Sequence, residues 1–265
     1  KTNDNIITFR RTEYGDLLLT ALEHDNNRQY DATIEDWTEI LKRNNNFDAA
    51  YIQIGKALYR QGEYEEAMQY YQYAYDTENY SEAYKEVRKE WANKFFWMIP
   101  IVIVVACLLV AKFFGFAGKV NKRTALKVGR KSLKEELLYA FHVIFHPFDG
   151  FWDLKHEKRG SVRSAFVILL ITIVVYFYNS IGQGYIFNPR PSTAMNIMGA
   201  ITAVVVPLLL WVVANWCLTT LFEGEGSMKD IYIATCYALA PLSVFVTVST
   251  ILTNVLTSSE GQIVN

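Results

Sequence analysis

The chain has 265 residues and a formal net charge of −1 at pH 7, with 51% hydrophobic and 20% charged residues. This length accommodates a soluble domain together with several membrane spans. Three cysteines all lie in apolar segments and share no metal-ligand spacing, which argues against a disulfide framework and a zinc site. Residues 1–94 are polar, whereas residues 164–259 carry only five charged side chains, so the averages describe two unlike halves.

The first residues are predicted to form a strand that belongs to a domain upstream of this sequence. Residues 5–14 alternate and are rich enough in β-branched side chains to form a strand. The chain begins at Lys1 rather than a methionine, so we expect a piece of a longer product whose start is removed or absent. Residues 1–13 would then be the tail of a missing upstream domain.

An internal repeat follows, in residues 14–79. A shift of 34 residues superimposes Tyr30 on Tyr64 and Trp37 on Tyr71. Repeats of this period indicate stacked helical hairpins, of which roughly three are needed for stability.

The second copy, residues 48–79, resembles the tetratricopeptide repeat. Tyr51 stands at the large aromatic position and Gly55 at the small position of the first helix, while Tyr71 packs from the second helix. The resemblance is weaker over residues 14–47. It implies protein or peptide binding, and we select five residues for binding or packing: Trp37, Tyr51, Gly55, Tyr64 and Tyr71.

A helix predicted at residues 81–91 has no partner within the repeat. Three arrangements remain open: it caps the stack, an upstream domain covers the other end, or a partner protein does. Since no glycine or proline separates this helix from the apolar run that follows, we expect one continuous helix up to Pro100. The repeat module would then occupy residues 14–94.

Residues 95–117 are apolar except for Lys112 and have the length of a transmembrane helix. Trp91 and Trp97 fit an interfacial aromatic belt. Lysines and arginines are more frequent after this span than before it, so we expect the loop 118–163 to be cytoplasmic and the repeat module to be extracytoplasmic.

The loop 118–163 combines a basic run with an amphipathic helix predicted at residues 132–146. Leu137, Phe141 and Phe145 share its apolar face, and Phe148 and Trp152 continue the aromatic character. The pattern predicts a helix in the membrane interface, next to anionic lipid headgroups. The positive-inside rule accounts for the basic run, so we expect no nucleic-acid partner.

Histidines in this loop are weak metal candidates. His142 and His146 are four residues apart, with His156 nearby, but Val143 occupies the position where metalloproteases place a glutamate. We favour interfacial histidines over a metal site and expect no catalytic residue, cofactor or metal.

Three further spans are predicted at residues 164–187, 195–221 and 231–255. No ionisable side chain lies at their mid-depth, which argues against an autonomous ion-coupled pump. Asn215 is expected to form interhelical hydrogen bonds, although Asn215, Pro207 and Pro241 could instead line a cavity.

The segment from residue 132 to 265 resembles the Yip (Ypt-interacting protein) family. The markers are Gly224 and Gly226 in a turn, followed by Tyr237 and Pro241 in the sequence YALAP. The resemblance implies an integral membrane protein without enzymatic chemistry, here of the bacterial type with an added repeat module. Family members have about five spans, so we expect the membrane domain, residues 164–265, to be truncated at its C-terminus.

The fold class expected is therefore all-α: a short stack of tetratricopeptide-like hairpins followed by a four-span transmembrane bundle. The function expected is a non-enzymatic scaffold or accessory subunit in a bacterial cell membrane. It would couple the repeat module to a partner complex such as the subunits of an ABC-type carbohydrate importer. The alternative is that the membrane domain is itself a transporter or lipid-handling channel.

Overall fold

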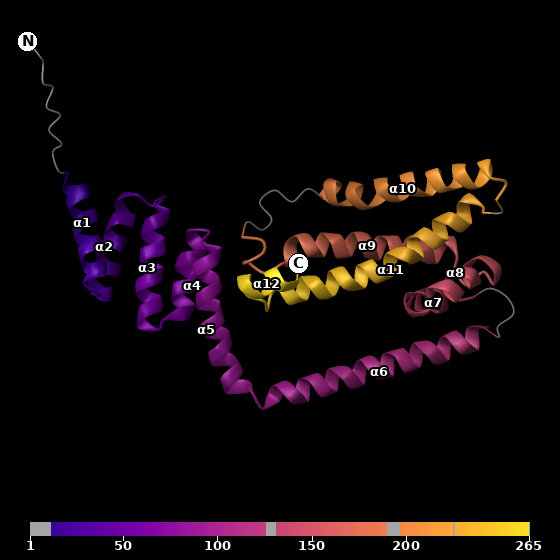
Figure 1. Ribbon diagram of the computed structural model, residues 1–265, viewed down its shortest axis with the longest axis horizontal. Coiled ribbons are helices and arrows are strands. Elements are labelled where there is room, and N and C mark those ends of the chain that lie inside the picture. Colours follow the sequence, from indigo (N-terminus) through magenta and orange to yellow (C-terminus); the bar gives the residue numbers. More distant parts are fainter. Residues whose placement is uncertain (1–11, 126–130, 190–196, 225, 265) are drawn as a thin grey trace, which may run out of the picture. The chain divides into compact units, whose positions relative to one another are not determined.

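The computed structural model describes residues 12–125, 131–189, 197–224 and 226–264, all of which lie in helices or short connections (Figure 1). Two compact units are present: unit 1 contains Lys1–Phe95, Tyr185–Pro189 and Leu256–Asn265, and unit 2 contains Phe96–Gly184 and Arg190–Val255. Most of the strand predicted at residues 5–14 falls outside the described residues, as does part of the basic run of the 118–163 loop.

Unit 1 is built on five successive helices, in which each packs against the next. They are α1 (Glu13–Asn26), α2 (Tyr30–Arg43), α3 (Asp48–Gln61), α4 (Tyr64–Tyr73) and α5 (Thr77–Phe95). Gly62 ends α3 in the left-handed conformation, at φ +89°, where its amide and that of Glu63 bond to the last turn. Glycine meets this requirement without strain because it has no Cβ.

Small and aromatic side chains alternate in the core of unit 1. Ala21, Ala50 and Ala67 are fully buried and allow neighbouring helices to approach, while Trp37 and Tyr71 fill the space between them.

Helix α5 is covered by two segments from much later in the chain. The short helix α12 (Ser258–Val264) meets it through Arg88, whose guanidinium donates two hydrogen bonds of 2.7 Å to the carboxylate of Glu260. The backbone amide of Ser258 donates to Ser81 Oγ at 2.8 Å. Tyr185, from the second segment, packs on Tyr80 with 4.5 Å between the ring centroids. Of the three arrangements considered for α5, the first applies, with later segments of the chain adding the cover.

The described residues of unit 2 form six helices: α6 (Met98–Ala125), α7 (Leu133–Phe145), α8 (Pro147–His156), α9 (Val162–Gly182), α10 (Ile197–Leu221) and α11 (Met228–Thr253). Four of them, α6, α9, α10 and α11, are long and apolar enough to cross a membrane. The predicted all-α class with a helical stack and four membrane-spanning helices is confirmed.

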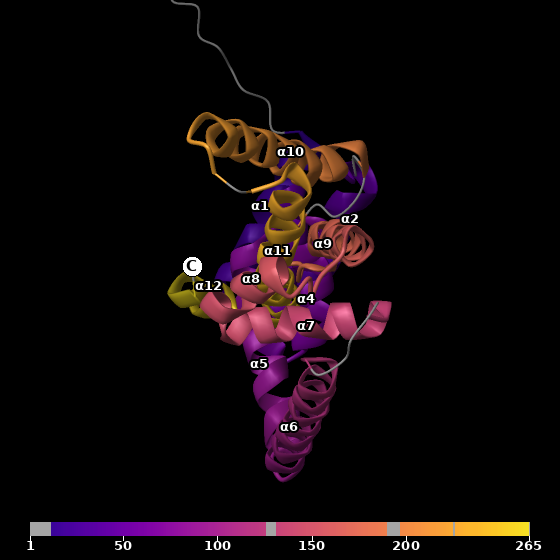
Figure 2. The same cartoon turned by 90° about the vertical axis from the view of Figure 1, so that its right-hand side faces the viewer.

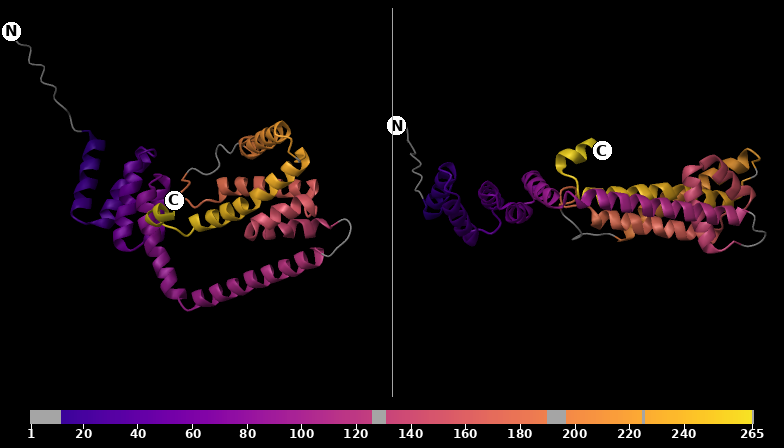
Figure 3. Two further views of the ribbon diagram at one scale, coloured as in Figure 1. Left: turned by 45° about the vertical axis from the view of Figure 1, so that its right-hand side comes forward. Right: turned by 90° about the horizontal axis from the view of Figure 1, so that it is seen from below.

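Helices α9 and α11 form the centre of unit 2 and run alongside each other (Figure 3). Two hydrogen bonds join them deep in the apolar surroundings: Thr172 Oγ1 lies 2.8 Å from Ser243 Oγ, and Thr250 Oγ1 donates to Asn179 Oδ1 at 2.8 Å. Helix α10 packs against both. Helix α7 lies between α6 and this group, as the end-on view shows (Figure 2), and its Phe141 packs on Phe113 and Phe114 of α6.

The expectation of one continuous helix up to Pro100 was wrong. Helix α5 ends at Phe95 and α6 begins at Met98, with Phe96 and Trp97 in a turn. Pro100 explains the break: a proline inside a helix lacks the amide hydrogen and its ring clashes with the carbonyl four residues earlier, here that of Phe96. Proline is tolerated within the first turn of a new helix, which is where α6 places it.

Candidate functional site

Three helices of unit 2 begin at one junction, and each start is fixed by a serine. Ser132 and Ser161 form capping boxes at the N-termini of α7 and α9, and Ser227 accepts a hydrogen bond from the Asp230 amide at the start of α11. Such caps satisfy backbone amides that the first helical turn leaves without partners. Helix α8 packs beside α7 and completes the junction.

Glu136 is the central buried carboxylate of this junction and is only 4% exposed. The hydroxyl of Ser161 donates a short hydrogen bond to one carboxylate oxygen, and Arg163 donates to the other at 3.4 Å. A buried carboxylate needs such donors because it loses its hydration. Glu136 therefore ties α7 to the start of α9.

Tyr237 brings α11 into the same junction. Its side chain is fully buried, and its hydroxyl donates to the backbone carbonyl of Glu136 at 2.8 Å and lies 3.0 Å from Ser164 Oγ. One side chain thus connects the three helices α7, α9 and α11. Gly160 allows this packing, since a Cβ at that position would lie 2.8 Å from Leu154 and 3.0 Å from the Tyr237 ring.

A second polar group holds α7 against α8 and the connection that follows it. The Tyr139 hydroxyl donates to Asp153 at 2.7 Å, and burial together with this carboxylate raises the Tyr139 pKa. The buried guanidinium of Arg159 lies over the Tyr139 ring, 4.7 Å from its centroid, and donates to the Asn121 carbonyl at 3.0 Å. These contacts fix the connection between α8 and α9.

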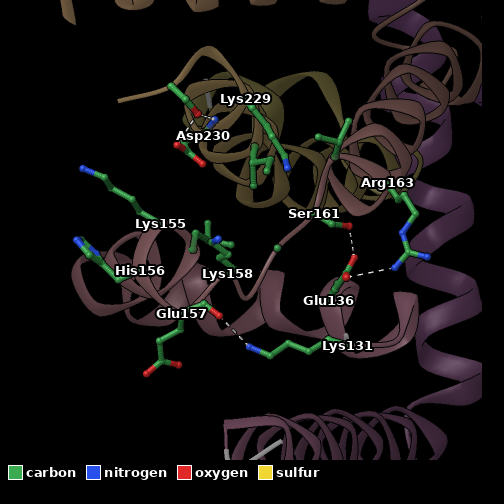
Figure 4. Close-up of a pocket in the computed structure, with 15 residues that line it drawn as sticks. Lys131, Glu136, Lys155, His156, Glu157, Lys158, Ser161, Arg163, Lys229 and Asp230 are labelled. Atoms are coloured by element: carbon green, nitrogen blue, oxygen red, sulfur yellow. Dashed lines mark hydrogen bonds and ion pairs between the residues drawn. The ribbon is translucent and has the colours of Figure 1, made fainter. Parts of the chain in front are cut away.

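The four helices surround a pocket of about 1080 Å³ (Figure 4). Cationic side chains outnumber carboxylates along its lining. The cationic residues are Lys131, Lys155, Lys158, Arg163 and Lys229, and the acidic residues are Glu136, Glu157 and Asp230. The excess of cationic side chains in this pocket suits an anion.

Two positions that the sequence singled out form the turn before α11. A Cβ at Gly224 would lie 2.8 Å from Thr219 Cγ2, and one at Gly226 would lie 3.1 Å from the same atom. The Gly224 amide donates to the Thr219 carbonyl at 2.8 Å. The turn folds tightly over the end of α10 and delivers Ser227 to the start of α11, beside the pocket.

Residues 141–264, which run from the C-terminal part of α7 to α12, match the family model of the Yip1 domain. No curated protein matches the chain. No solved structure matches it either.

Residues 141–264 thus fit the Yip-family membrane domain that the sequence predicted, and together with the four apolar helices they fit a multi-pass membrane protein. The Yip family is membrane-associated and non-enzymatic. The tetratricopeptide assignment and the bacterial type stay predictions. All four marker residues, Gly224, Gly226, Tyr237 and Pro241, lie inside the Yip1 match, with Pro241 in the unbroken helix α11.

Asn215 also lies inside the Yip1 match but apart from the pocket. It is half-buried on α10, and its amide donates to the Trp211 carbonyl of the same helix at 2.8 Å. Pro207 lies inside α10 as well. Hydrogen bonds between membrane helices are formed instead by pairs such as Thr172–Ser243 and Thr250–Asn179.

The three histidines do not converge. The rings of His142 and His146 stack with 4.8 Å between centroids, while His156 stacks on Trp152 at 4.3 Å. Burial and the neighbouring His146 lower the His142 pKa, so its neutral form is favoured. Within residues 12–125, 131–189, 197–224 and 226–264, no group of three His, Cys, Asp or Glu side chains could hold a metal ion.

The aromatic residues predicted for the membrane interface are all exposed. Trp91 lies in the last part of α5 and Trp97 in the turn before α6, and Phe148 and Trp152 project from α8. Phe148 is 92% exposed, which is unusual for phenylalanine in water and is expected where lipid covers the surface.

The residues selected from the repeat lie in unit 1. Trp37 and Tyr71 are buried in its core, and a Cβ at Gly55 would lie 2.6 Å from the Tyr71 ring. Tyr51 and Tyr64 are half-buried; the Tyr51 hydroxyl donates to the Asn45 carbonyl at 3.0 Å, and the Tyr64 ring packs on Tyr59. These contacts are packing contacts.

The sequence reasoning missed Glu136, Ser161, Ser164 and Arg159. It selected the apolar face of the 132–146 helix, whereas the most buried side chains of α7 are Glu136, Tyr139, Ala140 and Val143. Two signals were present: the pattern Ser132-Leu-Lys-Glu135 is a capping box, and Ser161 and Ser164 have the same spacing.

Proposed function

We propose that the chain is a non-enzymatic membrane scaffold, or an accessory subunit, that couples its repeat module to a partner complex in a bacterial cell membrane. The observation that carries the proposal is the make-up of unit 1. The helical stack α1–α5 is closed by segments that directly follow the membrane helices α9 and α11, through Tyr185 and Glu260. Binding to the stack would therefore act on the ends of membrane helices.

The proposed topology draws on the same contacts. Because residues 185–189 and 256–264 belong to unit 1, the C-terminal ends of α9 and α11 are expected on the same side of the membrane as the stack. The lysine- and arginine-rich loop favours the cytoplasm for the opposite side. The stack would then be extracytoplasmic, in a position to contact envelope proteins.

The membrane helices support an accessory role rather than transport by this chain alone. Among their described residues, hydroxyl and amide groups form the polar contacts, and Asn215 bonds only to its own helix. Transporters usually place ionisable side chains within the membrane. A transport complex such as the subunits of an ABC-type carbohydrate importer is the partner proposed first.

Purification tests the proposal. When the tagged chain is extracted from its native membrane in a mild detergent, a stoichiometric membrane partner is expected to co-elute. The variant Arg88→Glu should weaken this recovery, because it places two carboxylates together at the α5–α12 contact, and Arg88→Glu with Glu260→Arg should restore it. Recovery of the native chain as a lone monomer contradicts the proposal.

The same contact gives a pH prediction. Hydrogen bonds from Arg88 and from the Thr257 amide lower the Glu260 pKa to about 2, whereas an unfolded glutamate titrates near 4.5. A depressed folded pKa means that the pair stabilises the docked α12 above about pH 4.5 and loses this contribution as the pH falls toward 2. Glu260 is 40% exposed, so water screens the pair and the effect should be modest.

Hydrogen exchange of residues 258–264, corrected for intrinsic rates, measures this loss. Protection should fall between pH 5 and pH 2 in the native chain, and Glu260→Gln should be less protected at pH 6 and show no such fall. Equal profiles for the two proteins would show that the ion pair does not hold α12.

A further inference from the structure

The pocket between α7, α8, α9 and α11 carries cationic groups that its own carboxylates do not neutralise. Glu136 is already bonded to Ser161 and Arg163, and Asp230 accepts a 2.5 Å hydrogen bond from Ser227. Glu157 is exposed, and in Figure 4 its carboxylate lies on the outer side of the group.

Two lysines in particular are left for a ligand. Lys158 and Lys229 make no hydrogen bond or ion pair with any side chain that the structure describes, and they come from opposite walls, the α8–α9 connection and the start of α11. Lys131 is bonded to the Glu157 carbonyl at 3.2 Å, and burial together with Arg159 lowers its pKa. A bound anion would relieve this crowding of positive charge.

Backbone dipoles add to the field of the lysines. The N-terminal residues of α9 and α11 line the pocket, and helix N-termini carry a partial positive charge of roughly half a unit. Phosphate groups are commonly held at such ends. Helices α9 and α11 have 21 and 26 residues, so their dipoles are fully developed.

The position of the pocket selects the source of the anion. Helices α9 and α11 are both candidate membrane spans, so a pocket at their N-terminal ends lies at the level of the lipid headgroups. On α8, Trp152 is exposed and stacks on His156, a pocket residue, and Phe148 is exposed one turn earlier. Exposed aromatic side chains beside cationic ones are typical of a surface that meets lipid.

We propose that this pocket binds the phosphate of an anionic glycerophospholipid headgroup, with Lys158 and Lys229 as its principal ligands. The volume of about 1080 Å³ is ample for a glycerophosphate headgroup. The binding would be specific to one pocket, unlike the general attraction of a basic loop to a charged membrane. It would also fix the junction that Glu136 and Tyr237 hold together.

Lipid titration of the purified full chain in a neutral detergent, read by native mass spectrometry, tests the proposal. Phosphatidylglycerol is expected to bind at least tenfold more tightly than phosphatidylcholine, and the affinity should fall as salt rises. The double variant Lys158→Gln/Lys229→Gln should weaken phosphatidylglycerol binding at least tenfold. The control Lys119→Gln/Lys122→Gln removes two exposed lysines of α6 and should change it less than twofold.

Three results would overturn the proposal. Equal binding of the two lipids removes the requirement for an anion. Equal weakening by the control variant indicates general attraction to a basic surface. Glycerol 3-phosphate binding as tightly as phosphatidylglycerol assigns the pocket to a soluble phosphate instead. An unchanged melting temperature of both variants, expected because all four lysines lie outside the apolar cores, excludes misfolding.

Discussion

Replacing Gly55 by leucine is expected to unfold the α3–α4 pair of unit 1. A Cβ at this position would lie 2.6 Å from Tyr71 Cε1 and 2.9 Å from Cδ1, and both residues are buried. The ring has little room to move aside, because Tyr71 is 2% exposed and belongs to the same buried core as Ile54, Leu58 and Ala67. Overpacking of this kind costs about 3 kcal/mol or more of the free energy of unfolding.

Hydrogen exchange of the full chain in detergent would localise the effect. Peptides of α3 and α4 should lose protection, while those of α9 and α11, in unit 2, should keep it. Lys56→Leu is the matched control, since it adds the same side chain at the exposed neighbouring position of the same helix. Unchanged protection in Gly55→Leu would show that the two helices do not approach as closely as described.

A coupled variant sharpens this result. Gly55→Ala and Tyr71→Leu should each destabilise unit 1, but the double variant should cost less than the two combined, because the smaller side chain makes room for the new methyl group. Neighbouring residues typically couple by about 0.5–3 kcal/mol. Strict additivity would mean that the Gly55–Tyr71 contact does not limit the packing of α3 on α4.

The second large effect is expected at Tyr237. Tyr237→Ala removes a fully buried ring between α7, α9 and α11 and should cost about 3–5 kcal/mol. Tyr237→Phe keeps the ring but removes the hydroxyl that bonds to the Glu136 carbonyl and to Ser164, which should cost about 0.5–1.5 kcal/mol.

Thermal unfolding in detergent measures both variants of Tyr237. Phe245→Ala is the control, because it truncates an aromatic residue of the same helix that is 71% exposed, and it should change the melting temperature little. If Tyr237→Phe lowers the melting temperature as much as Tyr237→Ala does, the hydroxyl alone accounts for the contribution of Tyr237 to stability. Equal melting temperatures for Tyr237→Ala and Phe245→Ala would contradict the central place given to Tyr237.

Much of the fold could be predicted because local composition decides it. A run of apolar residues long enough to cross a membrane has few alternatives to a helix, so four spans were predicted and the structure has the four apolar helices α6, α9, α10 and α11. Helix α6 extends to Ala125, well past residue 117, where the first span was expected to end. Helices α2 to α4 were equally readable, since Gly55, Gly62 and Tyr71 occupy positions that fix a tight hairpin.

The pocket could not be predicted, because its residues come from three separate stretches of sequence. Glu136 and Lys229 are 93 positions apart, and no periodicity relates them. The buried face of α7 was missed for a related reason. A glutamate in an amphipathic helix usually faces water, and Glu136 is buried because hydrogen bonds from Ser161 and Arg163 replace its lost hydration. The break before Pro100 could have been found by applying the rule for proline to Phe96.

The composition of unit 1 also sets an order of events during synthesis. Helices α1–α5 are synthesised first, residues 185–189 only after α9, and Ser258 and Glu260 only after α11. The contacts of α12 with Ser81 and Arg88 therefore form only once α11 has been synthesised. A chain that stops at Thr253 would lack these contacts, whereas Tyr185 would still be available to pack on Tyr80 of α5.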